Sequence, residues 1–127
     1  MIPATKQFSW NEYLRLATDL AQNQDEASHR TSISRAYYSV FHAATIQAKQ
    51  NGYSGGSHKE IWATYQKDSD RNCKRLSTIG NQMKVARKAA DYDATVPDIP
   101  DVMAQQLKYA NEFMAMLATL PSTSPQP

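Results

Sequence analysis

Cysteine, glycine and proline are scarce in this chain of 127 residues. It has one cysteine, Cys73, four glycines and six prolines, and three of the prolines fall within the last seven residues. A single cysteine excludes an intramolecular disulfide and a cysteine zinc cluster, and it fits a reducing compartment. Helices tolerate glycine and proline least, so their scarcity before the tail favours an all-α chain.

Long apolar runs and a strong net charge are also absent. The chain begins with MIPATKQFSWNEY, which lacks the apolar segment of a secretory signal, and no window approaches the ~20 apolar residues of a membrane span. The formal net charge is +2, which neither requires nor excludes an anionic partner. We expect a soluble, cytoplasmic protein that does not associate with membranes.

Apolar periodicity and capping signals predict five helices in one domain, residues 1–120, followed by a disordered tail at 121–127. Short polar breaks separate the helices, and no internal repeat is present. The capping boxes Ser9–Glu12 and Ser57–Glu60 are expected to open the first and third helices. The second helix is expected to run from about Asp25 to Asn51 and the fourth from about Asp70 to Ala90. The fifth is expected to begin near Asp98, with Pro100 in its first turn. These elements predict an all-α, antiparallel up-and-down bundle of four to five helices.

The second predicted helix carries two different faces. At about 100° per residue, Ile33, Tyr37, Val40 and Ala44 fall on one face, which we expect to meet the core. No acidic residue occurs in this helix from residue 27 to residue 50, so the opposite face lacks the charge pairs of an ordinary solvated helix. That face carries Arg35, Tyr38, Ser39, His42, Ile46 and Lys49.

A face that mixes apolar and basic side chains suits contact with a second molecule. A second copy related by a two-fold axis would bring two Arg35/His42 pairs together, with Tyr38, Ser39 and Ile46 at the dimer interface. The alternative is that the fifth helix, which has two apolar faces, covers this side within the same chain.

Arg35 and His42 lie two helical turns apart, with Tyr38 between them. His42 can exchange protons near neutral pH, and the planar guanidinium of Arg35 can hold a phosphate. Together they could cleave RNA without a metal ion: the 2′-hydroxyl attacks the adjacent phosphorus, His42 moves a proton and Arg35 stabilises the transition state, with Tyr38 as an assistant. Alternatively, His42 is only structural and Arg35 pairs with a neighbouring helix.

The fourth predicted helix is basic and contains no acidic residue from residue 71 to residue 90. Its field could attract nucleic-acid phosphates, or its charges could form an ordinary solvated flank. The residues that we expect to contact phosphate are Lys49 of the second helix and Lys84, Arg87 and Lys88 of the fourth.

Other polar residues receive structural interpretations. Asp91 and Asp93 fall in the loop predicted after the fourth helix and are expected to cap it or pair with Arg87 rather than bind a metal. His58 is expected to reflect local structure at the start of the third helix, and Cys73 to be inert. We expect no metal site and no cofactor.

Four segments resemble, in order and spacing, the small stand-alone HEPN proteins of prokaryotes. The segments are RTSISRAYYSVFHAA, SHKEIW, VARKAADYD and YANEFMAML. The resemblance extends from about Trp10 to Leu120, and SRAYYSVFHAA is its most specific part. It implies a homodimeric helical bundle. Many relatives are metal-independent endoribonucleases that act as toxins or antiphage effectors, often beside a nucleotidyltransferase-type antitoxin.

The family hallmark is an Arg followed by four to six residues and a His on a helix at the dimer interface, which Arg35 and His42 match with six between them. The chain departs from the known nucleases at Ala36, where a polar residue is usual. It carries Ala44 where some toxins carry a tyrosine that the antitoxin modifies, so control by that modification is not expected. Other HEPN domains are non-catalytic: they bind nucleotides or RNA, or dock onto a nucleotidyltransferase. A purely structural helical adaptor is a third interpretation.

Overall fold

The computed structural model describes residues 7–120, which form an all-α bundle without strands. The predicted fold class is confirmed at this level, whereas the predicted tail at 121–127 lies outside the described residues. No helix in the described part of the chain is long and apolar enough to cross a bilayer. The helices are α1 Asn11–Leu20, α2 Glu26–Gln50, α3 His58–Lys67, α4 Arg71–Tyr92 and α5 Ile99–Thr119.

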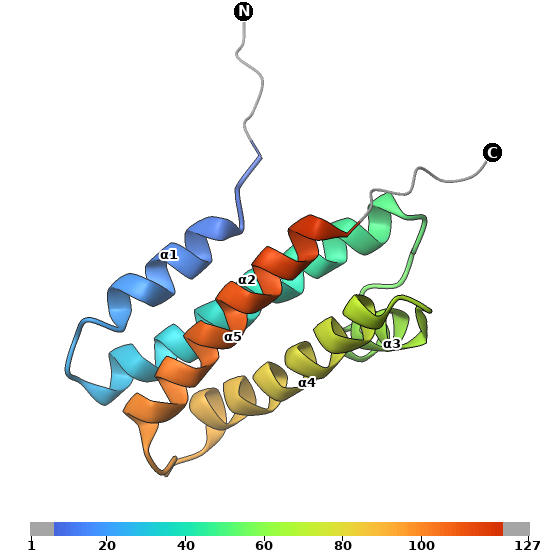
Figure 1. Ribbon diagram of the computed structural model, residues 1–127. Helices are drawn as coiled ribbons and strands as arrows, with labels where there is room; N and C mark the ends of the chain where they lie inside the picture. Colours follow the sequence, from blue (N-terminus) through green and yellow to red (C-terminus); the bar gives the residue numbers. More distant parts are fainter. Residues whose placement is uncertain (1–6, 121–127) are drawn as a thin grey trace, which may run out of the picture.

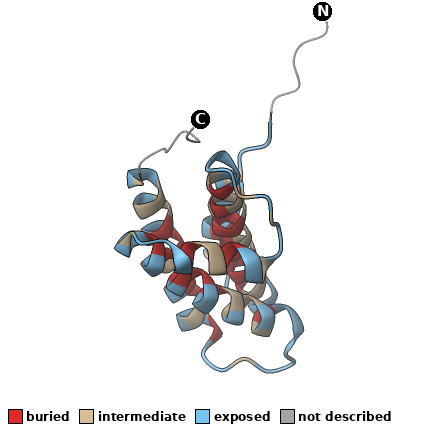
Figure 2. Cartoon of the chain, turned by 90° about the vertical axis from the view of Figure 1, so that its right-hand side faces the viewer, coloured by how far each residue is buried: buried red, intermediate tan, exposed pale blue. Residues whose placement is uncertain are grey.

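Helices α1, α2, α4 and α5 run along one another, and α3 lies at one end of the bundle (Figure 1). The chain reverses direction from α1 to α2, from α2 to α4 and from α4 to α5, which gives the expected up-and-down arrangement. Helix α2 is the central element, since it contacts each of the other four helices. The buried face of each helix turns inward, and the exposed faces form the outer surface (Figure 2).

Three helices begin with a side-chain cap. The carboxylates of Asp25 and Asp70 and the hydroxyl of Ser57 accept hydrogen bonds from backbone N–H groups at the starts of α2, α4 and α3. The expected cap at Ser9 is wrong: Trp10 occupies the N-cap position of α1, and no side chain caps that helix. Asp98 stands at the N-cap of α5 with a left-handed φ of 55°, but its side chain makes no capping hydrogen bond either.

The last turn of α4 differs from the sequence prediction. Asp91 and Tyr92 were expected in a loop, but α4 continues to Tyr92 and Asp93 is its C-cap. The guanidinium of Arg30 stabilises this end, because it donates hydrogen bonds to the carbonyl oxygens of Ala90, Asp93 and Ala94. These bonds satisfy carbonyls that a helix end leaves without partners, and they attach the end of α4 to the start of α2.

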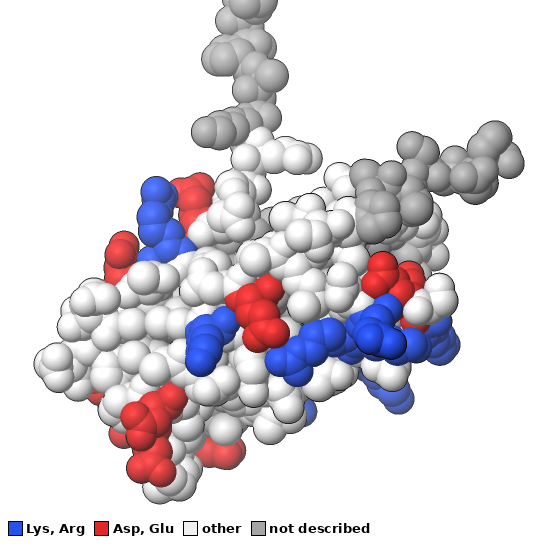
Figure 3. Space-filling view, in the orientation of Figure 1, with Lys and Arg blue, Asp and Glu red and all other residues white. Residues whose placement is uncertain are grey.

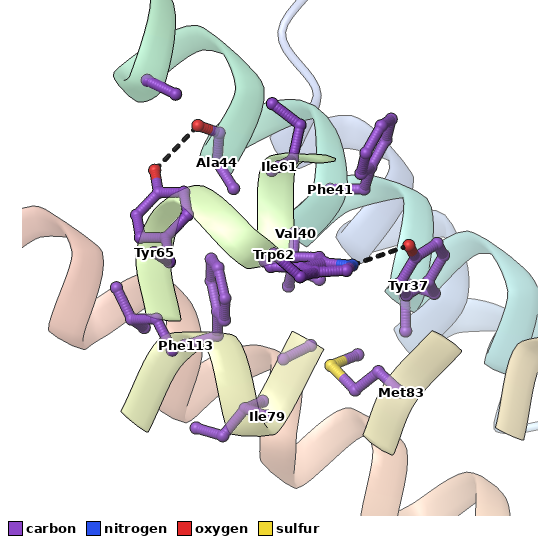
Figure 4. Close-up of a cluster of buried hydrophobic side chains, with 14 of the residues drawn as sticks. Tyr37, Val40, Phe41, Ala44, Ile61, Trp62, Tyr65, Ile79, Met83 and Phe113 are labelled. Carbon is purple, nitrogen blue, oxygen red and sulfur yellow. Dashed lines mark hydrogen bonds between the residues drawn. The ribbon is translucent and has the colours of Figure 1, made fainter. Parts of the chain in front are cut away.

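The core is centred on Trp62 of α3, which is 1% exposed and lies among side chains of α2, α4 and α5 (Figure 4). Its indole Nε1 donates a hydrogen bond of 3.1 Å to the hydroxyl of Tyr37, and the Tyr65 hydroxyl donates one of 2.7 Å to the carbonyl of Ala44. The indole ring fits because Gly80 of α4 has no side chain. A β-carbon at that position would lie 2.5 Å from two ring carbons of Trp62.

The Gly80→Ala variant should therefore be less stable than the wild type, although alanine is the better helix former. We expect overpacking against Trp62 to lower the free energy of unfolding by about 1–3 kcal/mol, measured by urea denaturation. Gly56→Ala is the matched control, since nothing lies within 4 Å of a β-carbon there. A Gly80→Ala variant as stable as the wild type would contradict the proposed packing.

Candidate functional site

The three predicted catalytic residues of α2 line one open groove, which we call the α1–α4 groove, with a volume of about 300 Å³. Its walls come from Trp10 and Tyr13 of α1, from Arg35, Tyr38 and His42 of α2, and from Arg87 and Asp91 of α4. Helix α5 contributes nothing to this lining, so the alternative in which the fifth helix covers this face is wrong. The start of α1 covers part of it instead.

Arg35 is held between aromatic rings. Its guanidinium carbon lies 4.8 Å from the ring centre of Tyr13 and 5.1 Å from that of Tyr38, both within cation–π range. Its Nη2 donates a hydrogen bond of 3.3 Å to the hydroxyl of Ser34. In residues 7–120 Arg35 makes no salt bridge, so the expected alternative of an ion pair with a neighbouring helix is not observed.

One carboxylate, that of Asp91, interacts with both arginines of the groove, directly with Arg87 and through the Ser34 hydroxyl with Arg35. The Ser34 hydroxyl that accepts from Arg35 donates to Asp91 Oδ2 at 3.2 Å, and Arg87 Nη1 lies 3.6 Å from the same oxygen. The predicted pairing of Asp91 with Arg87 is thus confirmed. Two guanidinium groups against one carboxylate leave a positive charge in the groove, which an anionic ligand would balance.

Arg87 is mostly buried, rather than part of a solvated flank. Its side chain is 11% exposed, and its Nε is buried without a hydrogen-bond partner among the described residues. Its guanidinium carbon lies 5.6 Å from the ring centre of Tyr37 and 5.4 Å from that of Tyr38. A buried cation with one loose ion pair is unfavourable alone, so the site around Arg87 is suited to an added anion.

His42 is half-buried beneath the start of α1. Its ring stacks on Trp10 with 3.6 Å between ring centres and an interplanar angle of 14°. Neither ring nitrogen has a hydrogen-bond partner within residues 7–120. Burial, and secondly the charge of Arg35, lower the pKa of His42 below its ordinary 6.5. The imidazole is therefore neutral near pH 7, which is the form that accepts a proton.

Several other predicted residues lie elsewhere. Ile46 and Lys49 line a neighbouring groove with Phe8, Lys84 lies in a shallow groove beside α3, and Lys88 is exposed on α4. Ser39 is wrong as an interface residue: it is fully buried, and its hydroxyl donates to the Ala36 carbonyl of its own helix.

The remaining basic residues of α4 do not form a continuous positive surface. Arg75 pairs with Glu112 of α5 at 3.2 Å, and Lys74 donates to the carbonyl of Gln66. Acidic side chains lie beside the basic ones on the face seen in Figure 3. Among residues 7–120, no three His, Cys, Asp or Glu side chains lie together as a potential metal site.

The structure adds residues to the groove that the sequence reasoning missed. The sequence does not mark Trp10, Tyr13 or Ser34 as site residues. His58 of α3 lies behind the groove, with its ring stacked 3.9 Å from that of Phe41. No local spacing signals this contact, because it depends on how α3 folds back against α2.

Comparisons of the chain with models of known protein families, with curated proteins and with solved structures find no match. The resemblance to HEPN proteins therefore rests on the sequence motifs. The groove has to be interpreted from its own geometry and charges.

We predict that replacing Arg35 with Gln raises the pKa of His42 toward 6.5, because a nearby positive charge is removed. The pKa should be followed by NMR titration of the His42 ring protons, with Arg71→Gln at the far end of α4 as the control. Since protonation is disfavoured in the folded state, His42 stabilises the fold above pH 6.5, and this contribution is lost as the pH falls through its lowered pKa. A wild-type pKa above 6.5 would contradict the described environment.

Proposed function

We propose that this protein is a HEPN-type, metal-independent endoribonuclease that acts as a toxin or antiphage effector and cleaves RNA in the α1–α4 groove. One observation carries the proposal. The imidazole of His42 and the guanidinium groups of Arg35 and Arg87 lie around one tyrosine, Tyr38, in an open groove. Neither nitrogen of this imidazole has a hydrogen-bond partner within residues 7–120. Such a reaction needs a general base, cationic groups that bind the phosphate, and a groove that is open to an RNA strand.

In the proposed reaction, the 2′-hydroxyl of the substrate attacks the adjacent phosphorus. His42, neutral at pH 7, accepts the 2′-hydroxyl proton, and Arg35 stabilises the negative charge that grows on the non-bridging oxygens. The bond from phosphorus to the 5′-oxygen then breaks, and that oxygen takes a proton. The products are a 2′,3′-cyclic phosphate and a 5′-hydroxyl. The Tyr38 ring lies 6.1 Å from the His42 ring, and its hydroxyl is the proposed assistant.

A homodimer is compatible with this chemistry, in which the imidazolium that forms when His42 accepts the 2′-hydroxyl proton, or water, gives a proton to the leaving oxygen. A second copy would bring a second His42 to the same cleft. Support for an interface on this face comes from Phe8, which is 49% exposed, and Ile46, which is 46% exposed; both line the groove next to the α1–α4 groove. Such adjacent apolar side chains suit a protein contact. A nucleotidyltransferase-type antitoxin is a further proposed partner.

A second candidate function is a non-catalytic module that binds a nucleotide or RNA, or docks onto a nucleotidyltransferase. The stacking of Trp10 on His42 favours it, because the ring that would accept a proton is covered on one face. Aromatic rings beside arginines can also hold bases and phosphates without any reaction. The two functions differ in whether the bound RNA is cleaved.

We predict that the purified protein cleaves a mixed RNA pool in EDTA and leaves 2′,3′-cyclic phosphates. His42→Ala should lower the rate by about 100- to 10,000-fold, the usual contribution of a general acid–base residue. Tyr38→Phe tests the hydroxyl while keeping the ring, and Arg71→Ala is the control for unspecific charge effects. Wild-type protein that is folded and binds RNA but does not cleave it would favour the non-catalytic module.

The dimer is tested separately at Ile46. Ile46→Glu should raise the dimer dissociation constant at least about tenfold, measured by sedimentation velocity, because it places a charge in an apolar contact. Val85→Glu is the matched control, since Val85 is 67% exposed on α4 and lies outside the groove. Wild-type protein that stays monomeric at micromolar concentration would rule out the composite site.

A further inference from the structure

His58 is joined to the groove through aromatic contacts. Its ring lies parallel to Phe41, with 3.9 Å between ring centres and an interplanar angle of 8°, and it meets the Tyr38 ring edge-on at 5.9 Å. Phe41 also contacts the His42 ring at 5.5 Å. The two histidines therefore share two aromatic neighbours, Phe41 and Tyr38.

A hydrogen-bond chain fixes the protonation of His58. Trp62 Nε1 can only donate, so the Tyr37 oxygen is the acceptor in that 3.1 Å bond (Figure 4). Tyr37 is fully buried, and burial raises its pKa to about 12, which keeps its hydroxyl protonated. The hydroxyl hydrogen has one acceptor within residues 7–120, His58 Nδ1 at 2.6 Å. His58 therefore accepts at Nδ1, and the neutral ring carries its hydrogen on Nε2.

Arg87 lies over the rings of Tyr37 and Tyr38, which His58 also contacts, and Lys84 lies one turn before Arg87 on α4. The pKa of His58 is lowered by burial first, and then by Arg87, Lys84 and His42. The one carboxylate that pairs with Arg87, that of Asp91, lies at 3.6 Å and is shared with Ser34. The buried Nε of Arg87 has no partner in the described part of the chain. Within residues 7–120, the His58 Nε2–H and the half-buried Lys84 have no acceptor, and Arg87 is only loosely paired with Asp91.

We propose that His58, Lys84 and Arg87 form a second phosphate subsite, in which the His58 Nε2–H donates a hydrogen bond to a non-bridging oxygen. This inference rests on the proposed function, and it specifies the substrate. Arg35 and His42 act at the scissile phosphate, and the second subsite holds the neighbouring phosphate of the same strand. Arg35 and Arg87 lie 5.1 Å and 5.4 Å from the centre of the Tyr38 ring, so the two subsites are adjacent. The substrate is then a polynucleotide rather than a mononucleotide.

The test compares two 2′-O-methyl RNA oligonucleotides without terminal phosphates, a dinucleotide with one phosphate and a trinucleotide with two. Because the 2′-hydroxyl is blocked, neither can be cleaved, and binding to the full chain can be measured by NMR titration. His58→Asn keeps an amide near Nδ1 for the Tyr37 hydroxyl but has no group at Nε2. His58→Gln places an amide N–H near Nε2.

We expect His58→Asn to weaken trinucleotide binding by about 10- to 100-fold, the loss typical of one hydrogen bond to a charged group, and to leave dinucleotide binding unchanged. His58→Gln should bind the trinucleotide more tightly than His58→Asn does. Lys84→Gln should show the same selective loss, and it keeps the proposal testable if the His58 variants do not fold.

Three results would overturn the subsite. One is an equal loss for both oligonucleotides, another is no loss for either, and the third is a hydrogen on Nδ1 of His58 in ¹⁵N NMR spectra of the wild type. If the wild type binds neither oligonucleotide, the proposed function itself fails. If it binds both and the His58 and Lys84 variants match it, only the second subsite fails.

Discussion

The contact between Trp62 and Gly80 is the constraint on which both the core and the groove depend. Since residue 80 has no side chain, the indole ring lies directly against α4 while its N–H reaches Tyr37 on α2. One side chain of the short α3 thus sets the spacing of two long helices. Tyr37 transmits this position outward, because its hydroxyl orients His58 and its ring lies beneath Arg87.

The charge of the groove follows from the same packing. Arg35 and Arg87 come from different helices and lie over one tyrosine, and a single carboxylate faces them. Burial is the main reason why the pKa values of His42 and His58 are lowered, and the charges of Arg35 on His42 and of Arg87 on His58 lower them further. The groove is therefore cationic through its arginines, while the imidazole of His42 in the groove and that of His58 nearby are neutral near pH 7.

The sequence predicted the parts of this molecule that depend on local spacing. The helices, the grouping of Arg35, Tyr38 and His42, and the pairing of Arg87 with Asp91 all follow from periods of three and four residues. Contacts between distant segments could not be predicted in this way. Examples are the stacking of Trp10 on His42 and the hydrogen bond from Tyr37 to His58. Ser39 was misplaced because it lies at the border between two faces, where a small side chain bonds to its own helix.

The bonds from Arg30 to the end of α4 have a mechanical consequence. Arg30 and Arg35 belong to the same helix, so α2 holds one wall of the groove directly and the other through the carbonyls of Ala90, Asp93 and Ala94. These hydrogen bonds join the two walls to each other. Helix α1 contacts the site through the rings of Trp10 and Tyr13. Displacement of α1 would uncover His42 and remove the Tyr13 ring from Arg35, whereas the contacts of Arg87 with Asp91, Tyr37 and Tyr38 do not involve α1.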